Sequence, residues 1–158
     1  MHGGYNARSV MDPLWANPSL CQPGESPLAC ELRVNNSSIV FIALGTGDQY
    51  AWRDFEKNYR KIIEYTIGQS VLPVLVTKAD SLEFQQGGAE AQFINNVIRR
   101  LGQEYDVPVL DLWLAVQGLP NGGLVREGGQ DFHLSNEGNT RHNLITLQTL
   151  DVIWRKYP

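Results

Sequence analysis

The stretch Ser38-Ile39-Val40-Phe41-Ile42-Ala43-Leu44-Gly45-Thr46-Gly47-Asp48 decides how this chain folds. Residues 39–44 are all apolar, which predicts a strand that is buried on both faces of a sheet. The run ends in a Gly-x-Gly turn, and a helical pattern begins at Gln49. This order is typical of a parallel strand that leads into a crossover helix. Because ligands of open α/β sheets gather at the carboxyl ends of the strands, residues 45–48 form the first candidate for a functional turn.

Helical and strand patterns alternate through the rest of the chain. The expected elements are a strand over 38–44, a helix over 49–67, a strand over 71–77, a helix over 89–104, a strand over 107–112, a long loop over 115–134, and a last helix from Ser135 or Asn136 to 156. Strands that are separated by helices predict a parallel sheet covered on both faces, an α/β fold of three-layer, flavodoxin-like architecture. The last helix is expected to bury Leu144, Leu147, Leu150 and Trp154.

Residues 1–36 differ in composition from the rest, being rich in Gly, Pro, Asn and Ser. They predict an irregular arm with one short helical turn near residues 10–16, ahead of a single domain over 37–158. Cys21 and Cys30 flank a Pro/Gly loop within this arm. The two thiols either close a small disulfide loop, worth roughly 2–3 kcal/mol, or remain unpaired, and we weigh these alternatives equally.

Bulk composition excludes several classes of function. The 158 residues are 42% hydrophobic and 19% charged, with a net charge of -4, which fits one compact domain. The basic residues form no stripe, so nucleic acid is not an expected partner. No run reaches the ~20 apolar residues of a membrane span. The first nine residues lack the pattern of a signal peptide, and neither a metal site nor a cofactor is expected.

The second informative stretch is residues 129–138, where His133 lies in a glycine-flanked loop just before the last helix. Asp131 is two positions earlier. A carboxylate can orient an imidazole as a general base, which makes His133 a candidate catalytic residue. A loop histidine that hydrogen-bonds the helix N-terminus has about equal weight.

With these two stretches, the chain resembles the SGNH hydrolases, also called GDSL esterases and lipases. Gly45-Thr46-Gly47-Asp48 resembles the family's Gly-x-Asn-Asp block, and Gln130-Asp131-Phe132-His133 resembles its Asp-x-x-His block. The resemblance covers about residues 37–156 and implies ester hydrolysis by a serine nucleophile, with His133 as the base and no cofactor. It also implies that backbone amides near Gly4 and residues 45–47 bind the oxyanion.

Three departures from the family pattern bear on activity. Gly47 stands where the family has the Asn that donates to the oxyanion, a loss typically worth about 10²–10³ in rate. Gln130 stands at the position of the triad Asp, so that Asp131 serves His133 only if the loop is rerouted. No Gly-Asp-Ser occurs in the chain. The resemblance therefore predicts an SGNH domain that is truncated on its N-terminal side.

The arm carries candidates for the missing parts. Residues 3–9 resemble the family's glycine block, with the amide of Gly4 or Ala7 in the oxyanion position, and Ser9 is a candidate nucleophile beside it. A turn hydroxyl is the stronger interpretation of Ser9, as a helix cap is of Ser135.

The carboxyl ends of the first two predicted strands both bear polar residues. Lys78 and Asp80 follow the second strand and either line the cleft or form an exposed ion pair, which we favour. Asp48 either braces its own turn or contacts ligand.

Two functions from different classes remain open. The first is a hydrolase of small esters or acylated carbohydrates, and the second is an inactive remnant that binds a ligand or partner. An uncovered strand over 38–44 favours pairing with a second copy as a homodimer. Export is frequent in the family, and a disulfide would fit a secreted protein.

Overall fold

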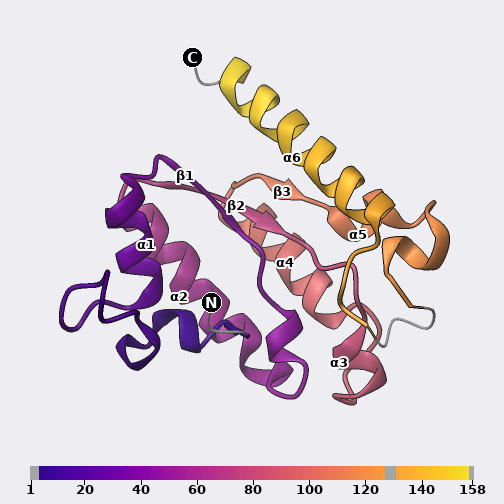
Figure 1. The fold of residues 1–158 in the computed structure, drawn as a ribbon, viewed down its shortest axis with the longest axis horizontal. Helices are drawn as coiled ribbons and strands as arrows, with labels where there is room; N and C mark the ends of the chain where they lie inside the picture. Colours follow the sequence, from indigo (N-terminus) through magenta and orange to yellow (C-terminus); the bar gives the residue numbers. More distant parts are fainter. Residues whose placement is uncertain (1–3, 127–130, 157–158) are drawn as a thin grey trace.

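The computed structural model describes residues 4–126 and 131–156 and has an α/β architecture (Figure 1). Its helices and strands are α1 (Pro27–Asn35), β1 (Ile39–Ile42), α2 (Trp52–Gly68), β2 (Leu72–Val76), α3 (Leu82–Gln85), α4 (Phe93–Glu104), β3 (Val109–Leu110), α5 (Leu112–Val116) and α6 (Asn136–Lys156). Short 3₁₀ turns are η1 (Ser9–Met11), η2 (Pro13–Trp15), η3 (Thr46–Asp48) and η4 (Pro120–Gly123).

The three strands form a parallel sheet in the order β1-β2-β3. Phe41 pairs with Val74, and Val76 pairs with Leu110, so the carboxyl ends of neighbouring strands meet at one edge of the sheet. The α/β prediction with a parallel sheet is confirmed. Within the described ranges β1 has a strand on one side only, which makes it an edge strand.

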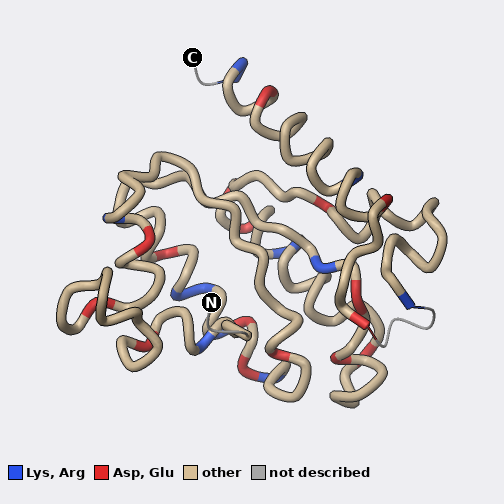
Figure 2. Tube along the Cα trace, in the orientation of Figure 1, with Lys and Arg blue, Asp and Glu red and all other residues tan. Residues whose placement is uncertain are grey.

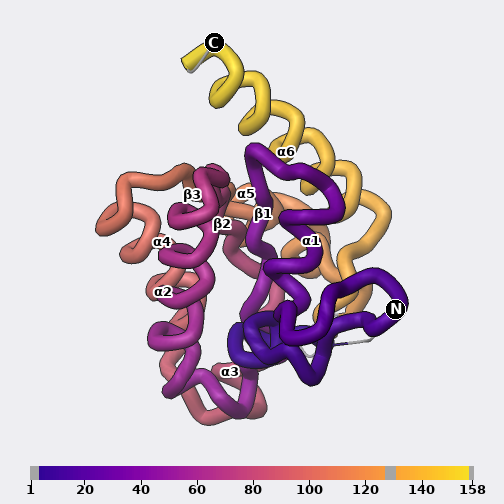
Figure 3. Tube along the Cα trace, turned by 90° about the vertical axis from the view of Figure 1, so that its left-hand side faces the viewer, coloured from indigo at the N-terminus to yellow at the C-terminus, as the bar shows by residue number. Residues whose placement is uncertain are grey.

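Helices cover both faces of this sheet, as Figure 3 shows with α2 and α4 on one side and α6 on the other. On the first side, Leu75 of β2 joins a cluster with Phe55 and Ile63 of α2 and Ile98 of α4. Val74 and Val76 point to the opposite face, where α5 and α6 cover them. Alternate residues of β2 are therefore buried on both faces, as the uninterrupted apolar run predicts.

The arm is more regular than expected. Residues 27–35 form helix α1, whose N-cap Ser26 accepts a hydrogen bond from the Ala29 amide and whose first residue is Pro27. Both are standard helix-start residues, but the surrounding Pro and Gly conceal the pattern. Leu28 and Leu32 join the same cluster as α2 and α4. Cys21 and Cys30 form a disulfide, which resolves that alternative.

Of the four residues of α6 that were predicted to be buried, three are not. Leu144, Leu147 and Trp154 are exposed, Trp154 to 77%. The contacts with the body come instead from Ile145 and Ile153, which pack against the α5 side of the sheet. Two apolar stripes run along this helix, and the structure places the leucine-rich one in solvent.

Two other elements differ from the predictions. The short helices α3 and α5 lie where a loop or the end of a strand was expected, and the strands are shorter than the apolar runs.

Basic and acidic residues are interspersed along the chain (Figure 2). Among the described residues, no helix has both the length and the apolar character that crossing a membrane requires.

Candidate active site

A small cleft lies at the carboxyl ends of β1 and β2, where the sheet edge, the loop before α6 and α6 itself meet. Its volume is about 190 Å³. The lining residues are Ala43, Leu44, Thr46, Val76, Thr77, Lys78, Ala79, Asp80, Leu112, Phe132, Leu134 and His142. Residues from both stretches that the sequence singled out, 38–48 and 129–138, thus line the same space: Thr46 from the first, and Phe132 and Leu134 from the second.

Asp131 and His133 form a hydrogen-bonded pair beside this cleft. Asp131 Oδ1 accepts from His133 Nδ1 at 2.5 Å and from the His133 backbone amide at 3.1 Å. The hydrogen bond from the imidazole is the main cause that lowers the pKa of Asp131 below its ordinary value. The loop is therefore routed so that Asp131 contacts the imidazole. With Nδ1–H donated to a carboxylate, the imidazole presents Nε2 as a base.

The backbone around His133 is fixed on both sides. Leu134 forms an antiparallel bridge with Leu124, and the His133 carbonyl accepts from the Val125 amide at 2.9 Å. The Phe132 ring stacks on the imidazole with 4.2 Å between centroids. The imidazole itself is 66% exposed, so Nε2 is accessible from solvent. Gln130, which stands at the position of the family's triad Asp, lies outside the described residues.

Ser135 is a helix cap, as the stronger interpretation predicts. Its hydroxyl accepts from the Gly138 amide at 3.1 Å and donates to Glu137 at 3.0 Å.

The glycine turn is shaped by two close approaches. Gly45 has φ +129°, and a Cβ there would lie 2.8 Å from the Ile94 side chain. A Cβ at Gly47 would lie 2.8 Å from the Tyr5 carbonyl oxygen of the arm. The arm therefore occupies the space that an asparagine side chain at position 47 would need. The family's amide donor at this position would therefore not fit beside the docked arm.

Asp48 fastens the arm to this turn. Its side chain is 1% exposed, and its two oxygens accept from the Ala7 amide at 3.0 and 3.1 Å. Burial raises the pKa of Asp48 to about 6, although the Ala7 hydrogen bond opposes that rise. The structure gives Asp48 a role that was not predicted, since its carboxylate holds the arm, 41 residues away, and not its own turn.

The structure does not bring the arm candidates to His133. The Ala7 amide is occupied by Asp48, so it does not point to an oxyanion. Ser9 is buried, and its hydroxyl accepts from the Asn6 amide at 2.9 Å within one turn of η1. Neither Ser9 nor Gly4 lines the cleft.

Lys78 and Asp80 are buried, so the exposed ion pair that we favoured is wrong. Lys78 Nζ lies 2.6 Å from Asp80 Oδ1 and also pairs with Glu83, which is fully buried. The Thr46 hydroxyl donates to Asp80 Oδ2 at 2.6 Å. This hydrogen bond joins the turn that follows β1 to the turn that follows β2. Asn95 of α4 holds the Lys78 backbone with two hydrogen bonds of 2.9 Å.

Two residues of this region were not singled out from the sequence. His142 lines the cleft, and Glu83 completes the buried network. Glu83 lies on the four-residue helix α3, which is too short to produce a helical pattern in the sequence. His142 falls one turn and a half into α6, and only the fold shows that it faces the strand ends.

Comparisons with known proteins agree with this fold. A GDSL-like lipase from Bacteroides thetaiotaomicron superposes with a TM-score of 0.59 at 17% identity, over 73% of this chain and 63% of that one. A protein from Bacteroides fragilis, whose name proposes an acylhydrolase, gives 0.57 at 16% identity, over 73% and 62%. The chain thus spans less than two thirds of the length of either structure. No curated protein matches the sequence significantly.

The family comparison covers most of the chain. The profile of the GDSL-like Lipase/Acylhydrolase family matches residues 2–141, which include the arm, the glycine turn and the Asp131–His133 pair. This protein belongs to the GDSL-like lipase/acylhydrolase family.

Proposed function

We propose that this chain hydrolyses esters of short acyl groups, with small esters or acylated carbohydrates as the substrate class. The observation that carries the proposal is the 2.5 Å contact between His133 Nδ1 and Asp131, which leaves Nε2 as a solvent-accessible base. His133 lies between Phe132 and Leu134, which both line the cleft. Family membership supports hydrolase chemistry of this type.

The dimensions of the cleft favour a short acyl group. Its volume of about 190 Å³ is below the range of about 300–1,000 Å³ that is typical of sites for drug-sized ligands. Apolar side chains from Leu44, Val76 and Leu112 make up one part of its lining. An acetyl to butyryl chain matches that space better than a fatty acyl chain.

The nucleophile we propose is water. Among the described residues that line the cleft, hydroxyl groups come from Thr46 and Thr77, and each donates to a carboxylate, of Asp80 and Asp111 respectively. Nε2 of His133 takes a proton from water as the new C–O bond forms. The imidazolium then returns that proton to the alcohol oxygen as the ester bond breaks, so acid and alcohol are released.

Backbone amides are available for the developing oxyanion. The N–H groups of Thr46 and Gly47 donate to no acceptor within the described part of the chain. They lie in the turn that borders the cleft. Such donors stabilise an oxyanion whatever side chain position 47 bears.

A p-nitrophenyl ester series tests the proposal. We expect turnover of acetate and butyrate to exceed that of octanoate. His133→Ala should abolish turnover, and Asp131→Asn should lower kcat by about 10²- to 10⁴-fold through loss of the tautomer. Turnover that is equal in wild type and His133→Ala would contradict the proposal.

Ser9→Ala separates a serine mechanism from a water mechanism, and Ser19→Ala at an exposed site is its control. If Ser9 is the nucleophile, Ser9→Ala loses activity; if water is the nucleophile, Ser9→Ala keeps it.

The second candidate function is a non-catalytic module that binds an acylated ligand. It is favoured by one observation, the lack of a serine hydroxyl among the described residues of the cleft. This candidate predicts no turnover but a rise in melting temperature with ligand. A panel of methyl esters and acetylated sugars that leaves Tm unchanged would remove it.

We also propose that two copies pair through the strand at 38–44. β1 is an edge strand in the described ranges, and edge strands favour pairing with another chain. Light scattering across a micromolar dilution series should show a dimer. Amide exchange at residues 39–42 should slow as protein concentration rises, and a monomer with concentration-independent exchange would refute pairing.

A further inference from the structure

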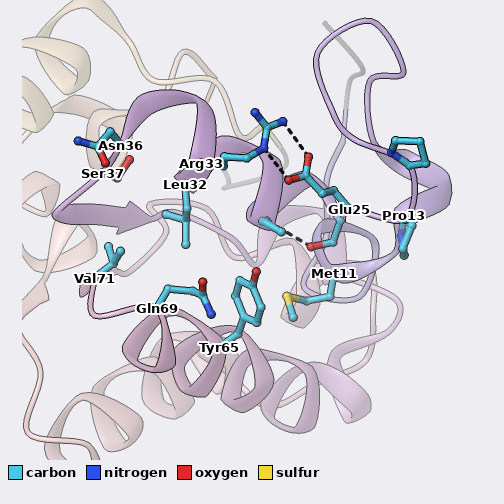
Figure 4. A pocket seen from close by; sticks show the side chains of 14 residues that line it. Met11, Pro13, Glu25, Leu32, Arg33, Asn36, Ser37, Tyr65, Gln69 and Val71 are labelled. Carbon is cyan, nitrogen blue, oxygen red and sulfur yellow. Dashed lines mark hydrogen bonds and ion pairs between the residues drawn. The ribbon is translucent and has the colours of Figure 1, made fainter.

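A second and larger cavity lies at the opposite end of the sheet from the cleft. Its volume is about 820 Å³, within the range of sites for small molecules. Asn36 and Ser37 precede β1, and Val71 precedes β2, so the cavity opens at the amino ends of these strands. The arm and α1 form one wall and α2 forms the other (Figure 4). None of the residues that line this cavity lines the cleft.

The charged groups of the cavity neutralise each other. Arg33 donates to both oxygens of Glu25, at 2.6 and 2.8 Å. The hydrogen bond from Arg33 is the main cause that lowers the pKa of Glu25 to about 2. These are the charged side chains of the lining. The cavity therefore offers no free charge to an ionic ligand, and it suits a neutral one.

Four neutral polar side chains of the cavity have no hydrogen-bond partner within the described part of the chain. They are the amides of Asn36 and Gln69 and the hydroxyls of Ser37 and Tyr65. Each such group both donates and accepts. Figure 4 shows the ends of the Tyr65 and Gln69 side chains directed from α2 toward the α1 wall. Four such groups could hydrogen-bond a ligand that has several hydroxyl groups.

The remaining lining is apolar except for Ser26, whose hydroxyl accepts from the Ala29 amide. Leu32 and Val71 are buried, and Met11 is half-buried beside them. A ligand that combines hydroxyl groups with a face of C–H bonds satisfies both kinds of surface. A sugar ring has these properties, and the volume exceeds what one ring fills.

The wall formed by the arm keeps its shape without a ligand. The Cys21–Cys30 disulfide joins the loop to α1, and Arg33 Nη2 also donates to the Leu20 carbonyl at 3.0 Å. The Gln22 amide donates to Glu25 at 2.7 Å. A preformed cavity loses less conformational freedom on binding.

From these observations we propose that the cavity between α1 and α2 is a binding site for a neutral saccharide, separate from the cleft beside His133. It would hold a glycan at one end of the sheet whether or not the other end hydrolyses an ester. In this proposal the arm contributes a rigid wall to the site and no catalytic group.

Binding of cellobiose, maltose and chitobiose by saturation-transfer NMR and calorimetry tests this site. We expect at least one disaccharide to bind, and Tyr65→Phe and Gln69→Ala each to weaken it by roughly two- to ten-fold, since each removes hydrogen bonds to the ligand. Tyr50→Phe and Gln103→Ala remove the same groups from exposed positions outside the cavity and serve as matched controls. His133→Ala should leave binding unchanged.

Two results would overturn the proposal. One is the lack of binding of all three disaccharides to the disulfide-bonded protein. The other is binding that the Tyr65 and Gln69 variants leave unchanged or that His133→Ala abolishes, since either places the sugar elsewhere. Circular dichroism of each variant shows whether it is folded. Ester hydrolysis is measured in parallel, so failure of this site is distinguished from failure of the proposed reaction.

Discussion

Stability should fall as pH rises from about 4 to about 6 because of Asp48. Its pKa is raised by burial from 3.8 to about 6 in the folded chain. The folded state therefore holds a proton that the unfolded state releases in this interval. At 1.36 kcal/mol per pH unit, the contribution is at most about 3 kcal/mol. It is fully present below about pH 4 and lost above about pH 6.

Urea unfolding of wild type and Asp48→Asn at intervals from pH 4 to pH 8 measures this contribution. Asparagine cannot ionise and still accepts one hydrogen bond from Ala7. Other carboxyls titrate in both proteins, so the free energy of unfolding of the wild type minus that of the variant isolates position 48. That difference should fall by up to about 3 kcal/mol between pH 4 and pH 7.

The control is Asp54→Asn, at an exposed position in the first turn of α2. Its difference curve gives the baseline for removing an exposed carboxyl. A curve for Asp48→Asn that does not fall relative to this baseline, or that rises with pH, would show that Asp48 is not held in a desolvated site against the Ala7 amide.

Three further changes test other contacts. Lys78→Met should destabilise the fold by about 3–5 kcal/mol in urea, because it leaves buried carboxylates unpaired; a loss below about 1 kcal/mol would contradict the buried network. Gly47→Asn should lower Tm without raising esterase activity, since the new side chain meets the Tyr5 carbonyl; a gain in turnover would refute the reasoning. Reduction of Cys21–Cys30 should lower the free energy of unfolding by about 2–3 kcal/mol, measured with and without dithiothreitol, and an unchanged midpoint would argue against a closed loop.

The sheet was predictable because its signal is local. Val74 and Val76 stand in an uninterrupted apolar run between polar turns, and such a run has few interpretations other than a buried strand. The face of α6 was not predictable in this way. Ile145 and Ile153 form one apolar stripe and Leu144 and Leu147 another, and periodicity alone does not say which one meets the body.

The site was predictable in its location but less so in its contacts. The turn after the first strand and the loop that bears His133 follow from strand ends and loop composition, and Thr46 of the one and Phe132 of the other line the cleft. The burial of Lys78 depends on Glu83 and on Asn95 of α4, and no spacing in the sequence indicates that these side chains converge. Likewise, the docking of Ala7 on Asp48 joins segments 41 residues apart.

The imidazole of the proposed reaction and the carboxylate that orients it belong to a single three-residue turn. In a triad whose members come from separate loops, relative motion of those loops separates the imidazole from its carboxylate. Here, any displacement of the segment that bears His133 carries Asp131 with it, since Asp131 binds both the ring and the backbone amide of His133. Changes elsewhere in the molecule would therefore alter where the imidazole lies relative to an ester, and hence which esters react, while the hydrogen bond between Asp131 and His133 stays intact.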